Sequence, residues 1–284
     1  MKLNLGAGPN WECKGWSVLD HKIKKNSKKL IGGDLNEIKI KNNTCSKIFI
    51  SHTLEHIPHI QIQKVLTEIN RVMKVGATLR LLVPNLEVIA KAYVKKDKNF
   101  FKKALDEDHS IRTDLGFGGM MMNFIVSPGQ DTMLINRKIN KFIAGYAHLY
   151  SYDFYMMKKL LELSGFTKIR KKKFCSSKTP DFRIPCHILG KEPKYHNLNN
   201  EFYKKNKLIH EYKNGKYHIN FKFTGFDKDP VTSLIIEATK KKYIKIKKSN
   251  DINFSGKNYN NYAFSLLHNQ DVKKAMKKKR IRSK

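Results

Sequence analysis

The amino-acid sequence predicts an α/β protein built on a mostly parallel β-sheet flanked by helices. Short apolar runs typical of strands alternate along the chain with longer stretches in which apolar residues recur at helical spacing. Because parallel strands have to be joined by crossover connections, this alternation is typical of a parallel sheet covered by helices. The first apolar run also leads directly into a Gly-x-Gly turn, which lets a ligand approach the backbone at the end of a strand.

Strands are expected where apolar runs are bounded by polar or turn-forming residues, at 2–6, 15–20, 47–51, 78–83, 166–174 and 233–238. Amphipathic helices are expected over 60–74, 86–94 and 151–165. Gly76 and Gly165 are expected to end the first and the last of these helices, because glycine adopts the left-handed conformation that commonly follows a helix. The charged segment 97–108 is expected to have helical character. The glycine- and methionine-rich segment 116–126 is expected to form a packed loop or lid.

The length of 284 residues fits one enzyme-sized domain with an appendage, since domains usually have about 100–200 residues. Hydrophobic residues make up 40% of the chain, which is enough for a sizeable core. We predict a domain over residues 1–240, with a polar insertion at about 190–230 before the last strand. Residues 241–284 are predicted to form a lysine-rich C-terminal tail.

The chain is strongly basic, with 57 Lys and Arg against 24 Asp and Glu and a net charge of +33. Only eight of the basic residues are arginine, so a lysine-rich composition explains the excess at least as well as a nucleic-acid partner, which is not favoured. No run of about 20 apolar residues is present, so we predict no membrane span and a cytoplasmic location. The cysteines lie far apart and predict free thiols rather than a zinc site.

The Gly-x-Gly turn has the wrong surroundings for a dinucleotide. Asp20 follows Gly8 by 12 residues, whereas a dinucleotide-binding fingerprint has its acidic residue about 20 residues on and adds a third glycine. The segment 9–14 is also too short for a helix whose N-terminus could hold a pyrophosphate. A ribose hydroxyl bound by Asp20, within a nucleoside that has no phosphate, fits this spacing better.

Five motifs follow one another in order: LNLGAG at Leu3–Gly8, GWSVLD at Gly15–Asp20, DL at Asp34–Leu35, SHTLEHI at Ser51–Ile57 and LTEINRVMKVGATLRLLVPNLE at Leu66–Glu87. Together they resemble the class I S-adenosylmethionine-dependent methyltransferases, and in particular a bacterial subgroup with the pattern LNLGxG…GWxxxD…DL…SHxLEH. The resemblance covers about residues 1–175 and 232–240. It implies a Rossmann-like fold, with S-adenosyl-L-methionine as the cofactor.

The resemblance also implies which residues bind that cofactor. Gly6 and Gly8 would admit its methionine and ribose parts, and Asp20 would bind the ribose hydroxyls. Asp34 and Leu35 would border the adenine, while Ser51 and His52 would lie beside the sulfonium. The full set of expected cofactor-binding residues is Leu5, Gly6, Ala7, Gly8, Asp20, Asp34, Leu35, Ser51 and His52.

A metal site is the competing interpretation of the SHTLEHIPH segment. His52, His56 and His59 have the spacing i, i+4, i+7, which would bring them near one face of a helix. Pro58 interrupts such a helix, and no acidic residue completes a two-histidine, one-carboxylate set at a familiar spacing. We therefore predict no metal site, and we expect Glu55 and His56 to tie this loop to the following helix.

His148 is the expected catalytic residue, because it precedes the segment LYSYDF where related enzymes carry a histidine on the substrate side. As a general base it would take a proton from an acceptor hydroxyl, and a structural role among the neighbouring aromatic residues is the other interpretation. The resemblance thus implies methylation of a small-molecule or glycan-linked acceptor at a hydroxyl. A basic nucleic-acid-binding protein, or a nucleic-acid methyltransferase on the same fold, is the alternative.

Overall fold

The computed structural model describes residues 1–104, 116–126, 148–184, 205, 210–211, 217–218 and 225–241. The predicted lysine-rich tail lies outside these residues apart from its first position, and so does most of the predicted insertion at about 190–230. Within the insertion, β7 (His210–Glu211) and β8 (Tyr217–His218) pair as a two-stranded antiparallel sheet. No described helix is long and apolar enough to cross a membrane.

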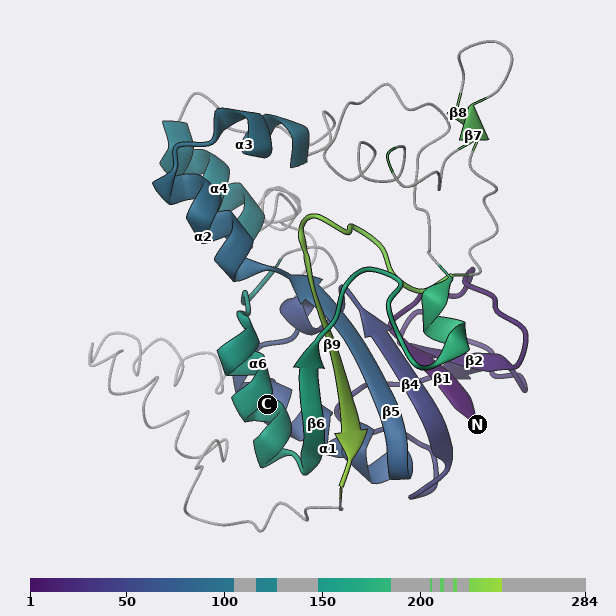
Figure 1. The fold of residues 1–284 in the computed structure, drawn as a ribbon. Helices are drawn as coiled ribbons and strands as arrows, with labels where there is room; N and C mark the ends of the chain where they lie inside the picture. Colours follow the sequence, from purple (N-terminus) through teal and green to yellow (C-terminus); the bar gives the residue numbers. More distant parts are fainter. Residues whose placement is uncertain are drawn as a thin grey trace, which may run out of the picture. The chain divides into compact units, whose positions relative to one another are not determined.

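Seven strands form the central sheet (Figure 1). They are β1 (Lys2–Leu5), β2 (Trp16–Asp20), β3 (Leu30–Gly32), β4 (Cys45–Ser51), β5 (Met73–Pro84), β6 (Phe166–Lys171) and β9 (Ser233–Lys240). Their order across the sheet is β3-β2-β1-β4-β5-β9-β6, and β9 runs antiparallel to both of its neighbours while the other pairs are parallel. The predicted α/β fold with a mostly parallel sheet is confirmed.

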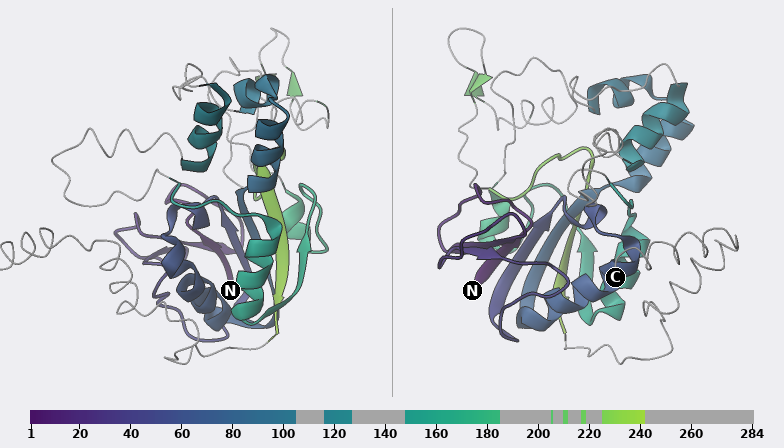
Figure 2. Two further views of the ribbon diagram at one scale, coloured as in Figure 1. Left: turned by 90° about the vertical axis from the view of Figure 1, so that its left-hand side faces the viewer. Right: turned by 180° about the vertical axis from the view of Figure 1, so that it is seen from behind.

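The two faces of the sheet are covered differently. Side chains alternate along each strand, so Ile48 and Ile50 of β4 point to one face and Phe49 to the other. The first face is covered by the apolar sides of α1 (His59–Val72) and α6 (Phe154–Leu163) (Figure 2). The other face carries an aromatic cluster, which consists of Trp11, Trp16, Phe49, Phe182 and Phe226 and includes a residue of the short helix η3 (Pro180–Arg183).

A third group of helices follows β5. α2 (Leu86–Val94), α3 (Lys98–Ala104) and α4 (Gly116–Val126) lie side by side in both figures and share a small apolar core of their own (Figures 1 and 2). The loop predicted for residues 116–126 is therefore wrong. Phe117, Met120, Met121, Phe124 and Ile125 have the spacing of one helical face, and they pack against this core. Packing of that face outweighs the low helix propensity of the glycines.

The end of α1 also differs from the prediction. The helix ends at Val72 and Met73 already belongs to β5, where it pairs with Cys45 of β4. Gly76 therefore lies within β5, at a φ of +79°, and does not end the helix. Gly165 does end α6 as predicted, because it follows the last helical residues at a φ of +85°.

A buried ion pair between Arg80 and Asp227 joins β5, in the middle of the sheet, to the segment that precedes β9. Arg80 of β5 has no exposed surface, and its guanidinium donates to both carboxylate oxygens of Asp227, which is also fully buried. The guanidinium also donates to Glu237 of β9 at 2.6 Å and to the backbone carbonyls of Lys173 and Ser176. The pair thus holds together β5, β9 and two connecting segments on the aromatic face of the sheet.

Asp227→Asn should destabilise the fold strongly, since removing one partner leaves a buried charge with less compensation. Because Glu237 still pairs with Arg80, we expect the lower end of the usual range, about 3 kcal/mol of unfolding free energy. Glu162→Gln is the matched control. It breaks an exposed ion pair with Lys158 and should change this free energy by less than about 0.5 kcal/mol. Urea unfolding measures both, and equal effects would contradict the role of Asp227.

Candidate active site

A cavity of about 710 Å³ opens at the carboxyl ends of β1, β2 and β4. This is the edge at which open α/β sheets bind ligands. Of the residues expected to bind the cofactor, seven line the cavity: Gly6, Ala7, Gly8, Asp20, Asp34, Leu35 and His52. Leu5 lies fully buried in the core beneath it, and Ser51 is not among its lining residues.

The turn after β1 depends on its two glycines for different reasons. Gly6 has a φ of +73°, and a Cβ at this position would lie 2.4 Å from Oγ1 of Thr53. Gly8 has a φ of +74°, but a Cβ there would meet no atom within 4 Å. Gly6 is therefore required by packing against the residues after β4, whereas Gly8 keeps the backbone open on the cavity side.

Asp20 closes this turn from the neighbouring strand. Its carboxylate is 6% exposed and accepts a hydrogen bond from the backbone N–H of Gly8 at Oδ2 (2.9 Å) and one from the backbone N–H of Lys22 at Oδ1 (2.8 Å). A carboxylate oxygen can accept more than one hydrogen bond, so each oxygen keeps capacity for a ligand hydroxyl. Asp20 is both a structural clamp on the glycine turn and an acceptor at the cavity wall.

Asp34 and Leu35 form the wall next to β3. Asp34 is exposed, and its Oδ1 accepts a hydrogen bond from the backbone N–H of Asn36 at 2.7 Å, which fixes the turn that carries both residues. Leu35 is half-buried and packs against the main core. The wall therefore offers one polar and one apolar side chain to a planar ligand.

His52 has an unusual backbone at the end of β4, with a φ of +47°. The backbone N–H of His52 still donates to the carbonyl of Leu82, and its side chain turns toward the sheet edge. There its Nδ1 lies 3.2 Å from Oε1 of Glu55, and its Nε2 lies 2.8 Å from Oγ of Ser233 in β9. Both ring nitrogens are thus held by the protein, and the ring has a fixed orientation.

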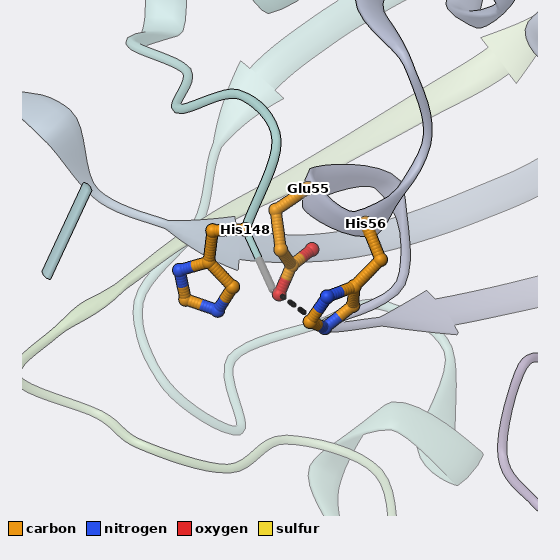
Figure 3. A group of neighbouring side chains, drawn as sticks. All are labelled: Glu55, His56 and His148. Atoms are coloured by element: carbon orange, nitrogen blue, oxygen red, sulfur yellow. Dashed lines mark ion pairs between the residues drawn. The ribbon is translucent and has the colours of Figure 1, made fainter. Parts of the chain in front are cut away.

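The side chains of Glu55, His56 and His148 converge (Figure 3). Glu55 and His56 belong to the short helix η1 (Leu54–His56), whereas His148 follows the segment after α4. The backbone carbonyl of Glu55 accepts a hydrogen bond from the N–H of Leu149 at 2.7 Å, which holds the two segments together. The rings of His56 and His148 are 5.1 Å apart, and His56 also lines the cavity.

The electrostatics of this cluster favour a charged carboxylate and a neutral imidazole. Burial acts to raise the pKa of Glu55, but the hydrogen bond and the charge of His52 outweigh it, with a smaller contribution from His56, and lower the pKa. Burial lowers the pKa of His148, although the charge of Glu55 and the carbonyl of Phe124 act in the other direction. His148 is therefore predominantly neutral at pH 7.

Sequence reasoning did not anticipate the contribution of Thr53, His56 and Gln61 to the cavity wall. Thr53 and His56 belong to the polar run SHTLEHIPH after the apolar strand β4, which was the signal that could have identified them, whereas Gln61 lies beyond that run in α1. The pairing of His148 with Glu55 had no such signal, because 93 positions separate the two residues. The competing metal set of His52, His56 and His59 is not brought together, since the ring of His59 stacks on that of Tyr150 with their centroids 4.0 Å apart.

Residues 16–81 match the family model of the methyltransferase domain. The match confirms the predicted enzyme class, an S-adenosylmethionine-dependent methyltransferase, and with it S-adenosyl-L-methionine as the cofactor. No curated protein sequence matches the chain.

Several solved structures of methyltransferases are similar to this one. A SAM-dependent methyltransferase from Archaeoglobus fulgidus shares 15% identity over 84% of this chain and 85% of its own, with a TM-score of 0.37. A SAM-dependent methyltransferase from Mesorhizobium loti shares 9% identity over 84% of this chain and 90% of its own, with a TM-score of 0.39. A SAM-dependent methyltransferase from Methanosarcina mazei shares 12% identity over 84% of this chain and 91% of its own, with a TM-score of 0.37.

Gly6→Ala should destabilise the methyltransferase domain more than Gly8→Ala does. Both substitutions place an L-residue in the left-handed region, at about 1–2 kcal/mol each, but only Gly6→Ala adds the clash with Thr53. Thermal unfolding of the two variants compares them directly. If the two midpoints fall equally, the Thr53 contact does not constrain the turn.

Proposed function

We propose that the enzyme methylates a hydroxyl of a small-molecule or glycan-linked acceptor, and that it belongs to the bacterial subgroup that its motifs resemble. The observation that carries the proposal is the cavity at the carboxyl ends of β1, β2 and β4. It combines a glycine turn at positive φ and a buried carboxylate with a cluster of imidazoles at its border.

The residues of the cavity suit the cofactor. S-adenosylmethionine supplies a methyl group that its sulfonium already activates. Asp20 would accept hydrogen bonds from the ribose hydroxyls with its remaining acceptor capacity, while Gly8 leaves space beside them. Asp34 and Leu35 would border the adenine. Gly6, Ala7 and His52 would line the methionine end, and Leu5 and Ser51 would support that end from the strand termini.

The composition of the cavity wall supports an uncharged acceptor. Lys22 is the only lysine or arginine among the described residues that line the cavity, although the whole chain has 57 such residues. A nucleic acid usually requires several cationic side chains along its phosphates, so the wall favours a hydroxyl compound over a polynucleotide. His148, whose ring lies against that of His56 in the cavity wall, is the proposed catalytic residue that contacts the acceptor.

Methyl transfer needs little acid–base help, because the sulfonium is an activated leaving group. The protein contributes chiefly by holding the acceptor oxygen in line with the methyl group and by excluding water. The fixed ring of His52 and the anchored segment at Leu149 give the site the rigid borders that such positioning requires.

Asp20→Ala should raise the dissociation constant of S-adenosylhomocysteine by at least about tenfold, whereas His148→Ala should leave it nearly unchanged and slow turnover. Hydrogen bonds to a charged group contribute about 1.5–3 kcal/mol each, and about 1.4 kcal/mol corresponds to a factor of ten. Calorimetry measures both constants without knowledge of the acceptor.

Asp20→Asn is the matched control, because its amide oxygen can still accept the N–H of Gly8 and keep the turn closed. We expect an intermediate affinity for this variant. Thermal unfolding of all three variants separates loss of fold from loss of binding. Wild-type affinity in Asp20→Ala would remove Asp20 from the cofactor site.

A further inference from the structure

We propose that Glu55, His56 and His148 bind a divalent transition-metal cation, such as Zn²⁺, Mn²⁺ or Fe²⁺, at the border of the cavity. This site replaces our sequence-based prediction of no metal. The binding of the cation is independent of methyl transfer. Its use, which is to hold the acceptor oxygen, rests on the proposed function.

The donor atoms are already gathered. One donor atom from each residue lies within 4.8 Å of the other two, and Nε2 of His56 lies 4.0 Å from Oε1 of Glu55 (Figure 3). Ligands about 2.1 Å from a shared ion stand at most about 4.2 Å apart, so small side-chain rotations complete the set. Two imidazoles and one carboxylate are the ligands of catalytic zinc and of non-haem iron centres.

The hydrogen bonds around the cluster prepare its donors. Nδ1 of His148 lies 3.1 Å from the carbonyl of Phe124, which can only accept, so Nδ1 carries the proton and Nε2 has the free lone pair. His52 contacts Oε1 of Glu55 and is itself oriented by Ser233. Metal-binding histidines and carboxylates usually have such partners around them, and these partners fix the tautomer and the orientation of the ligand.

The burial of Glu55 gives an independent reason for a cation. The residue has no exposed surface, and its Oε2 has no hydrogen-bond partner among the residues that the structure describes. An ionised carboxylate in such a place needs a compensating charge and a partner for each oxygen. A divalent cation between Glu55 and the two imidazoles supplies both.

The mixed donor set also indicates which cations bind. Mg²⁺ and Ca²⁺ prefer oxygen ligands only, whereas two imidazole nitrogens favour transition metals. A centre with three protein ligands keeps a position for a substrate oxygen. Because His56 lines the cavity, this position would face the cavity. The cation would lower the pKa of the acceptor hydroxyl, and its proton would pass to solvent.

The test is calorimetric titration of the full chain with Zn²⁺ and with Mn²⁺, after removal of metal by a chelator. We expect one cation per chain, with an affinity that falls at least about 100-fold in His56→Ala and in His148→Ala, since loss of an outer partner alone lowers affinity about 10–100-fold. Glu55→Gln, which keeps the shape of the side chain, should have a similar effect. His21→Ala is the control, because its exposed imidazole lies on the same cavity wall but outside the cluster.

Thermal unfolding of the same variants shows whether they remain folded, and His148→Gln replaces His148→Ala if that variant unfolds. No stoichiometric cation in the wild type, or equal affinity in the wild type and the three cluster variants, would overturn the metal site. Failure of the wild type to bind S-adenosylhomocysteine would overturn the proposed function instead. The two failures are therefore distinguishable.

Discussion

The buried carboxylate of Glu55 determines how the histidine side chains at the carboxyl end of β4 are arranged. A charged group with no exposed surface has to be surrounded by donors or cations, and three histidine rings lie around this one. To reach it, His52 adopts a positive φ, which is uncommon for a residue other than glycine. Such strain at a strand end is typical of functional sites, where the surroundings keep the backbone in place.

The same residue organises the chain through its backbone. Its carbonyl accepts the N–H of Leu149, so His148 is brought to the cavity by a contact between segments that are far apart in sequence. The carbonyl of Phe124, in α4, then orients the His148 ring. The helices after β5 thus do more than form their own small core, because α4 holds the ring that we propose as catalytic.

The sequence was sufficient for the sheet and for the residues gathered at its carboxyl edge, because both depend on local patterns. Strand-ending residues such as Gly6, Gly8 and Asp20 meet at one edge of a parallel sheet, so their spacing predicts their proximity. The helix formed by residues 116–126 was missed because glycine content was weighted above the apolar spacing from Phe117 to Ile125. The contact between Glu55 and His148 arises from tertiary packing, and no local pattern encodes it.

The short connection between β1 and β2 makes this cavity different from a dinucleotide-binding site. In dinucleotide-binding folds a helix begins at the glycine turn and offers free backbone N–H groups to a pyrophosphate. Here no helix lies between β1 and β2, and the aromatic cluster covers the sheet in its place, held by the bond from Trp11 to the carbonyl of Gly225. The N–H of Gly8 is already bound to Asp20. The turn therefore presents a carboxylate to its ligand rather than a row of donors, and a carboxylate favours hydroxyls and a positively charged sulfonium over phosphate.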